Sequence, residues 1–105
     1  MSLGYAWEKM FNAVYGAASS EEPLQQRLAT AYMYHVMYVH KADVPAEIWE
    51  RVDALGKAVN SKPAVGSEGT IAATTSQMST EEASKWLEEI VSIFNSVAEE
   101  YYKSP

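Results

Sequence analysis

Cysteine is absent from the 105-residue chain, and this one absence excludes several kinds of chemistry. Without thiols the chain forms no structural disulfide, iron–sulfur cluster, cysteine-based zinc site or catalytic thiolate. Positive charge is also scarce, because eight Lys and Arg stand against fourteen Asp and Glu, and the formal net charge is −6. Nucleic-acid affinity depends on Lys and Arg displacing counterions from phosphates, so we expect no nucleic-acid partner.

Long apolar runs are missing as well. No stretch approaches 18 uninterrupted apolar residues, so we expect no membrane-spanning helix and no membrane partner. The first ten residues, MSLGYAWEKM, lack the basic and apolar regions of a secretory signal. The default expectation for such a sequence is a cytoplasmic protein.

The residues that are present favour one folded domain over the whole chain, 1–105. Hydrophobic residues make up 48% of the sequence and aromatic residues 11%, which is far from the composition of disordered chains. At this length the chain can enclose one core but not two. Apolar residues recur at intervals of three and four almost throughout, which predicts an all-α fold, a small bundle of about four amphipathic helices.

The predicted helices cover roughly residues 4–18, 21–40, 44–60 and 80–102. The last one has the clearest start, because Ser79 and Glu82 form a capping box and Met78 and Ala83 are spaced as a hydrophobic staple. Its apolar stripe is wide enough to pack against two neighbours, and it contains Ala83, Trp86, Leu87, Ile90, Val91, Ile93, Phe94, Val97, Ala98 and Tyr101. The first helix has a stripe of its own, formed by Trp7, Met10, Phe11, Val14, Tyr15 and Ala18.

Two further helix starts are predicted from capping residues. Ser19 and Glu22 match a capping box for the second helix, and Asp43 is the expected N-cap of the third. The third helix has a narrow stripe consisting of Ile48, Val52, Leu55 and Val59. On its exposed side we expect two ion pairs at i,i+4, Glu47 with Arg51 and Asp53 with Lys57.

One long Gly/Ser/Thr-rich connection, residues 60–78, separates the third helix from the last. Connections of this length without structure are uncommon in compact domains, so we expect a short helix within it, near residues 70–77. The connection is also long enough to cross one end of the bundle, in which case the last helix need not be antiparallel to the third.

The second helix is unusual because the eleven-residue stretch TAYMYHVMYVH carries no charge when its histidines are neutral. Its apolar residues fall on two nearly opposite faces, one with Tyr32 and His35 and the other with Met33, Met37 and His40. Such a helix is buried on both faces, either as the central element of the bundle or between the core and a partner. Aromatic residues and methionine are enriched at interface centres, but they also fill small cores.

Catalytic and metal-binding patterns are not found. His35 and His40 are separated by about 140° around a helix and cannot ligate one metal ion from the same face. The HExxH and ExxH patterns are absent, and GSEGT lacks the GK[ST] ending of a phosphate-binding loop. We therefore predict no metal site, no cofactor and no catalytic residue.

These observations favour a non-enzymatic interaction module that dimerises or binds another protein through the second helix. The candidate interface residues are Met33, Tyr34, Met37, Tyr38 and His40. The alternative is a small enzyme or ligand-binding bundle with an internal site lined by Tyr32 and His35. In that alternative His35 could also sense pH, because its ordinary pKa lies close to neutrality.

Overall fold

The computed structural model describes residues 2–64, 66 and 69–103, and its described part is helical without strands, as predicted. The α-helices are α1 (Leu3–Ser19), α2 (Leu24–Tyr34), α3 (Ala46–Ala58), α4 (Gly69–Thr75) and α5 (Thr80–Lys103). Two short 3₁₀ turns, η1 (Val36–Tyr38) and η2 (Lys41–Asp43), join α2 to α3. The short helix expected near residues 70–77 is α4, shifted by one or two residues.

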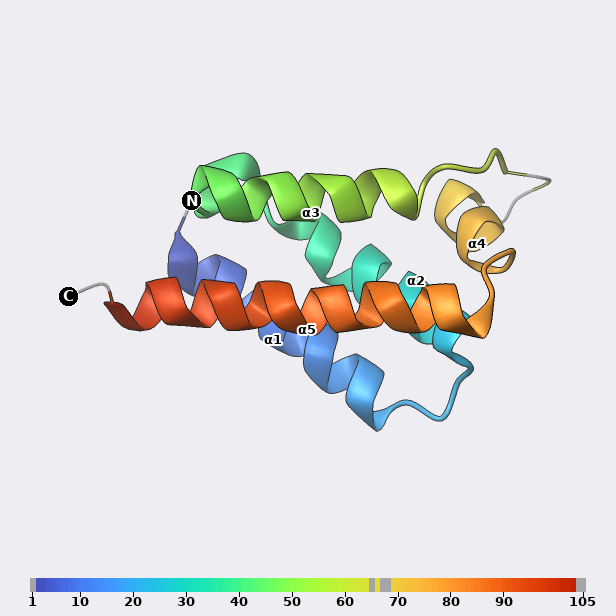
Figure 1. Cartoon of the computed structure of the whole chain (residues 1–105), viewed down its shortest axis with the longest axis horizontal. Helices are drawn as coiled ribbons and strands as arrows, with labels where there is room; N and C mark the ends of the chain where they lie inside the picture. Colours follow the sequence, from blue (N-terminus) through green and yellow to red (C-terminus); the bar gives the residue numbers. More distant parts are fainter. Residues whose placement is uncertain (1, 65, 67–68, 104–105) are drawn as a thin grey trace.

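The helices form an elongated bundle that measures 47 × 25 × 20 Å. The longest helix, α5, lies along the long axis and contacts α1, α2 and α3 (Figure 1). Both α1 and α3 run antiparallel to α5, and α2 runs opposite to α1 (Figure 1). The chain turns through α4 at one end of the bundle, so the long connection brings α5 back antiparallel to α3.

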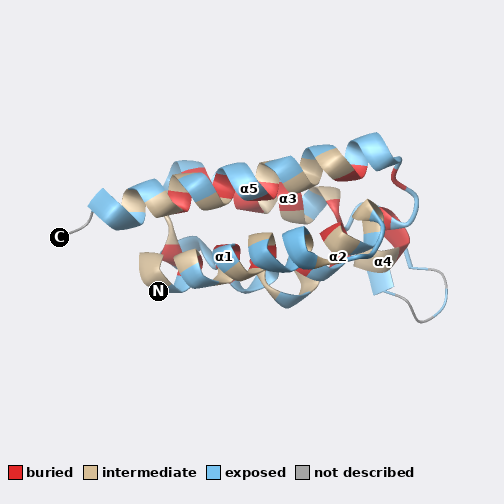
Figure 2. Cartoon of the chain, turned by 90° about the horizontal axis from the view of Figure 1, so that it is seen from below, coloured by how far each residue is buried: buried red, intermediate tan, exposed pale blue. Residues whose placement is uncertain are grey.

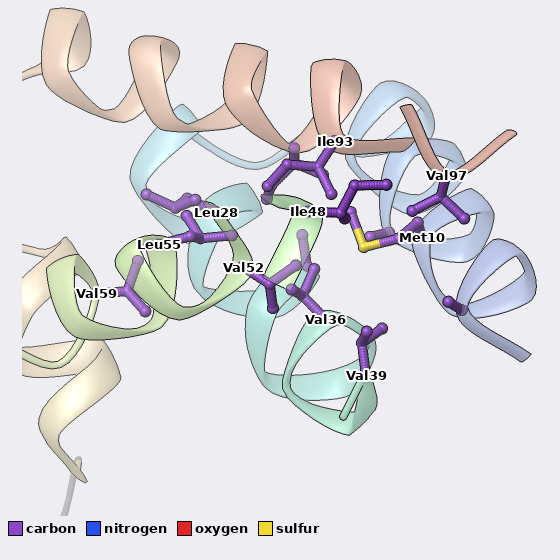
Figure 3. Packing of buried hydrophobic residues seen from close by; sticks show 14 of the residues in the cluster. Met10, Leu28, Val36, Val39, Ile48, Val52, Leu55, Val59, Ile93 and Val97 are labelled. Carbon is purple, nitrogen blue, oxygen red and sulfur yellow. The ribbon is translucent and has the colours of Figure 1, made fainter. Parts of the chain in front are cut away.

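The core is built from the inner sides of the helices (Figure 2). The turn η1 adds Val36 to it. Met10, Leu28, Leu55 and Ile93 are fully buried, and they come from α1, α2, α3 and α5 respectively. Figure 3 shows these side chains converging between the helices. The predicted stripe of α3 is confirmed, because all four of its residues are buried. Burying one such side chain contributes about 1.5–3 kcal/mol.

The start of α5 follows its sequence pattern. The backbone N–H of Glu82 donates to Ser79 Oγ at 3.0 Å, which is the predicted N-cap bond. Met78 and Ala83, the expected staple, are both buried. A well-capped first turn fixes where α5 begins, and therefore which of its residues face the core.

The predicted second helix, 21–40, is too long at both ends. Ser19 is the last residue of α1, and Ser20 instead accepts the backbone N–H of Glu22 at 3.0 Å. At the other end α2 stops at Tyr34, because the backbone leaves helical geometry at His35, where φ is −135°. The turn that follows directs Val36 and Val39 into the core, where both are buried. This tertiary burial outweighs the helical periodicity, in a stretch of aromatic and β-branched residues with low helix propensity.

The predicted third helix, 44–60, is also too long, and Asp43 does not cap it. Pro45 occupies the N-cap position of α3. The side chain of Asp43 is buried, and its two oxygens accept the backbone N–H groups of Ser2 and His40, each at 2.9 Å. Asp43 therefore ties the start of α1 to the 3₁₀ turns.

Arg51 makes a different ion pair from the one predicted. Its guanidinium donates to both carboxylate oxygens of Glu89 on α5 at 2.9 Å, and also to Ser92 and Ser96. The i,i+4 rule considers only residues of one helix, so it predicts Glu47 as the partner of Arg51. Glu89 comes close to Arg51 only through the packing of α5 against α3. The second predicted pair is confirmed, since Lys57 Nζ lies 3.0 Å from Asp53. Arg51 thus links the polar sides of α3 and α5 by a planar, bidentate contact.

Tyr32 packs against α3 at a glycine. A Cβ atom built on Gly56 would lie 2.7 Å from Tyr32 Oη and 3.5 Å from its Cζ. Burial and then the charge of Asp53 raise the pKa of the Tyr32 hydroxyl. Gly56 is therefore the residue that lets α2 and α3 approach each other here.

We predict that the effect of Gly56→Ala on stability depends on Tyr32. Alanine favours a helix over glycine by up to about 1 kcal/mol, but its methyl group would contact the Tyr32 hydroxyl. With Tyr32 present, Gly56→Ala should leave the unfolding free energy unchanged or lower it. In a Tyr32→Phe background, Gly56→Ala should raise the unfolding free energy by about 0.5–1 kcal/mol. Urea unfolding of the four proteins measures this, and an equal effect in both backgrounds would contradict the assignment.

We also predict that Asp43→Asn destabilises the protein by about 1–3 kcal/mol near pH 7, as expected for hydrogen bonds to a charged group. Burial alone would raise the pKa of Asp43, but the hydrogen bonds that its carboxylate accepts hold that pKa below its ordinary value. The stabilisation is therefore complete above about pH 4 and is lost as the pH falls through the lowered pKa. Unfolding free energies from pH 7 to pH 2 should converge for the two proteins; a constant difference would refute the linkage.

Candidate functional site

Most of the exposed large apolar side chains in the described part of the chain lie on α1 and α5. We call this surface the aromatic face, and it consists of Trp7, Phe11 and Tyr15 of α1 and Val91, Phe94, Tyr101 and Tyr102 of α5. Trp7 and Phe94 are partly buried against the core. The others are exposed: Phe11 by 40%, Tyr15 by 64%, Val91 by 51%, Tyr101 by 41% and Tyr102 by 71%.

The rings of this face form one continuous network. Trp7 stacks on Phe11 with ring centroids 5.1 Å apart and an interplanar angle of 2°, and Phe11 stacks in turn on Tyr15 at 6.1 Å. Phe94 lies 5.7 Å from Trp7 and 6.1 Å from Phe11, so it joins the row on α1 to α5. Tyr101 extends the network from Trp7 to Tyr102. Ring pairs of this kind contribute about 0.5–1.5 kcal/mol each, which holds the surface in a defined shape.

Trp7 is the anchor of the network. Its indole Nε1 is buried and has no hydrogen-bond partner among the described residues. An unpaired buried donor costs about 1–3 kcal/mol, and the ring contacts of Trp7 with Phe11, Phe94 and Tyr101 offset that cost. The position of Trp7 is therefore determined by packing and not by a hydrogen bond.

A groove continues the aromatic face toward the other end of α1 and α5. It encloses about 250 Å³ and shares Val91 with the face. Its remaining apolar lining comes from α1, α2 and α5, and comprises Val14, Ala17, Ala18, Leu24, Leu87 and Ile90. Arg27 and Glu88 are the charged residues of its lining. Small side chains on α1 thus leave a hollow beside the rings.

The predicted interface residues do not share one helix face, because α2 ends at Tyr34. Tyr34, Met37, Tyr38 and His40 are exposed and Met33 is half-buried. Met33 and Tyr34 line a groove of about 400 Å³ between α2 and α4. Tyr38 belongs to η1, and its ring lies 5.7 Å from Lys9 Nζ on α1.

Tyr32 and His35, the residues of the alternative site, face different surroundings. Tyr32 packs against Gly56 of α3. His35 lines a cavity of about 150 Å³ together with Ala13, Gly16 and Arg27, and Tyr32 is not part of its lining. Burial and then the charge of Lys9 lower the pKa of His35. Sites for drug-sized ligands enclose about 300–1,000 Å³, so this cavity is small for a metabolite.

Two further predictions concern metals and membranes. Within residues 2–64, 66 and 69–103, no three His, Asp or Glu side chains lie close enough together to hold a metal ion. In the same part of the chain, no helix has both the length and the apolar character needed to span a bilayer.

The aromatic face was not identified from the sequence. Apolar spacing places Phe11, Tyr15, Val91 and Tyr101 on the stripes by which α1 and α5 pack against their neighbours. The available signal was the width of those stripes, because the apolar sectors of α1 and α5 are broader than the sector that two packed helices bury. The residues at the outer edge of a wide stripe remain in solvent.

We predict that the exposed members of the aromatic face contribute little to folding. Tyr15→Ala should lower the unfolding free energy by less than about 1 kcal/mol, because most of the side chain is already in solvent. Ile93→Ala, a truncation in the core, should cost about 2–5 kcal/mol. Chemical unfolding of both variants is the measurement. Equal losses would show that Tyr15 belongs to the core of the monomer.

Comparison with protein-family models, with curated proteins and with solved structures finds no match to this chain. The surface that the chain presents is therefore the basis for inferring its function.

Proposed function

We propose that this protein is a non-enzymatic protein-interaction module and that the aromatic face is its principal binding surface. The observation that carries the proposal is the exposed ring network on α1 and α5. Tyrosine, tryptophan and phenylalanine are enriched at the centres of protein interfaces, where they supply large contact area with few rotatable bonds. A preformed row of stacked rings loses little entropy when a partner binds.

The size of the face is consistent with this role. A whole aromatic side chain has a surface of roughly 150–250 Å². At the exposed fractions given above, the five exposed residues of the face together present about 500 Å² to solvent. Patches on ordinary monomers reach about 300–600 Å² and are often functional. One side of a standard interface covers about 800 Å², which the face reaches when its polar borders are included.

A second surface supports the same function at a different place. The alternative docking residues are Met33 and Tyr34, which line the groove between α2 and α4, and Met37, Tyr38 and His40, which follow the break at His35. The lining of that groove contains no charged side chain. The two surfaces lie on different helices, so separate substitutions can test them.

The proposal is tested by photo-crosslinking in cells of the native host. A benzoylphenylalanine at Tyr15 or Tyr102 should give discrete adducts with one protein or a few, and one at the exposed Glu47 of α3 should give none. Phe11→Ser should remove the adducts formed from position 15 while leaving the fold intact by circular dichroism. A benzoylphenylalanine at Tyr34 tests the alternative surface. If neither surface forms an adduct, the protein does not act by binding proteins.

Light scattering after size exclusion identifies the kind of assembly. A mass that doubles with concentration, and returns to the monomer value in Phe11→Ser, indicates a second copy on the aromatic face. If the mass instead returns to the monomer value in the double variant Met33→Glu/Met37→Glu, the second copy binds at the alternative surface. A constant monomer mass together with adducts of another protein indicates a heterologous partner.

A further inference from the structure

We infer that the aromatic face binds a basic amphipathic helix of another protein; this inference rests on the proposed function. The first observation is a border of acidic residues. Glu8, Glu88 and Glu99 are all exposed. Each precedes a residue of the face by three positions, namely Phe11, Val91 and Tyr102 respectively. Residues three apart are neighbours on a helix surface, so each carboxylate lies beside the apolar surface.

The second observation is that the bases near this border, Lys9, Arg27, Lys85 and Lys103, already contact other groups of the chain. Arg51, Lys57 and Lys103 form ion pairs with Glu89, Asp53 and Glu100. Lys9 lies over the rings of Tyr5 and Tyr38, and Lys85 over Trp86. Lys41 belongs to η2, and Lys62 follows α3.

Arg27 is the one base that lines the adjoining groove. Its Nε donates to the carbonyl oxygen of Glu22. No hydrogen bond or ion pair between described residues involves the side chains of Glu8, Glu88 and Glu99. The border thus carries exposed glutamates on both α1 and α5, and Arg27 and Lys85 line grooves together with Glu88.

The third observation is the shape of the surface. The antiparallel helices α1 and α5 pack against each other (Figure 1). Their rings form a row, and the groove that contains Val91 lies at the end of that row. From Leu87 to Tyr102, α5 rises by about 22 Å, which equals four turns of a helix. A partner helix laid along this surface would place apolar residues at i, i+3 or i+4, and i+7 on the rings, with one side chain in the hollow. Its Lys and Arg side chains would then reach the glutamates on either side.

A second copy of this chain fits the surface less well. It would bring acidic borders against acidic borders, and each copy carries a net charge of −6. Like charges placed opposite each other across an interface are unfavourable. The same charge disfavours nucleic acid and anionic membranes, so complementarity selects a cationic helix that belongs to a different protein.

The test uses two 18-residue helical probes made equally helical by a hydrocarbon staple on the outer side. Both carry Leu and Phe in the same i, i+3, i+4, i+7 pattern, and the flanking positions are Lys and Arg in one peptide and Glu in the other. Fluorescence anisotropy at low salt should show the basic peptide binding at least tenfold more tightly. Its affinity should fall as salt is added, because the charges are exposed and screened.

Substitutions on the protein separate this site from general attraction to an acidic surface. Glu8→Lys/Glu99→Lys should weaken the basic peptide at least tenfold and strengthen the acidic one. The matched control, Glu47→Lys/Glu50→Lys on α3, changes the net charge equally and should have less than a threefold effect. Phe11→Ser should remove binding of the basic peptide.

Equal binding of the two peptides would overturn the inference. So would an effect of the α3 control as large as that of the border variant. Adducts from position 15 that contain only a second copy would also overturn it, and would leave the proposed function intact. If neither peptide binds and position 15 forms no adduct, the aromatic face has no role as a binding surface.

Discussion

Burial of the wide apolar stripe of α5 is the constraint on which the rest of the bundle depends. Ile90, Ile93 and Val97 are buried along one side of this helix, and α1, α2 and α3 each pack against it. At about 1.5–3 kcal/mol for each large side chain, the stripe contributes a substantial part of the hydrophobic stabilisation of a small domain. The Arg51 contact with Glu89 adds a polar link on the α3 side, and this link fixes α3 along and around α5.

The exposure of the aromatic face follows from the same packing. The stripes of α1 and α5 continue around each helix beyond the sector in which the two helices touch. Their inner residues, such as Met10 and Ile90, are buried, and the outer ones remain in solvent. Exposed rings favour association, whereas the glutamates at the border increase solubility. Rings and glutamates together favour a partner that supplies both an apolar stripe and positive charge. The proposed specificity therefore follows from how α1 and α5 pack.

Much of the fold could be predicted from local patterns, because local physics determines it. The stripe of α3 and the capped start of α5 depend on residues within one or two turns, and both were predicted correctly. The end of α2 depends on the burial of Val36 and Val39, which the uncharged periodicity of the segment does not reveal. The partner of Arg51 lies 38 residues away, beyond the range of any helical spacing rule.

The candidate surface was harder to predict than the fold. Apolar spacing identifies which residues share a side of a helix, but it does not show how much of that side a neighbour covers. Phe11 and Met10 are adjacent members of one stripe, yet Met10 is fully buried and Phe11 is exposed. The predicted residues Tyr34, Met37 and Tyr38 are accessible, but the break at His35 divides them between α2 and η1.

The central position of α5 also has a consequence for folding during synthesis. This helix leaves the ribosome after α1, α2, α3 and α4, yet its side chains complete the core that α1, α2 and α3 share. Until it emerges, the inner surfaces of those helices lack their largest common neighbour and stay accessible to water and to chaperones. Domains fold as units during translation, and contacts between distant segments form late. The core that α1, α2 and α3 share is therefore complete only after α5 has left the ribosome.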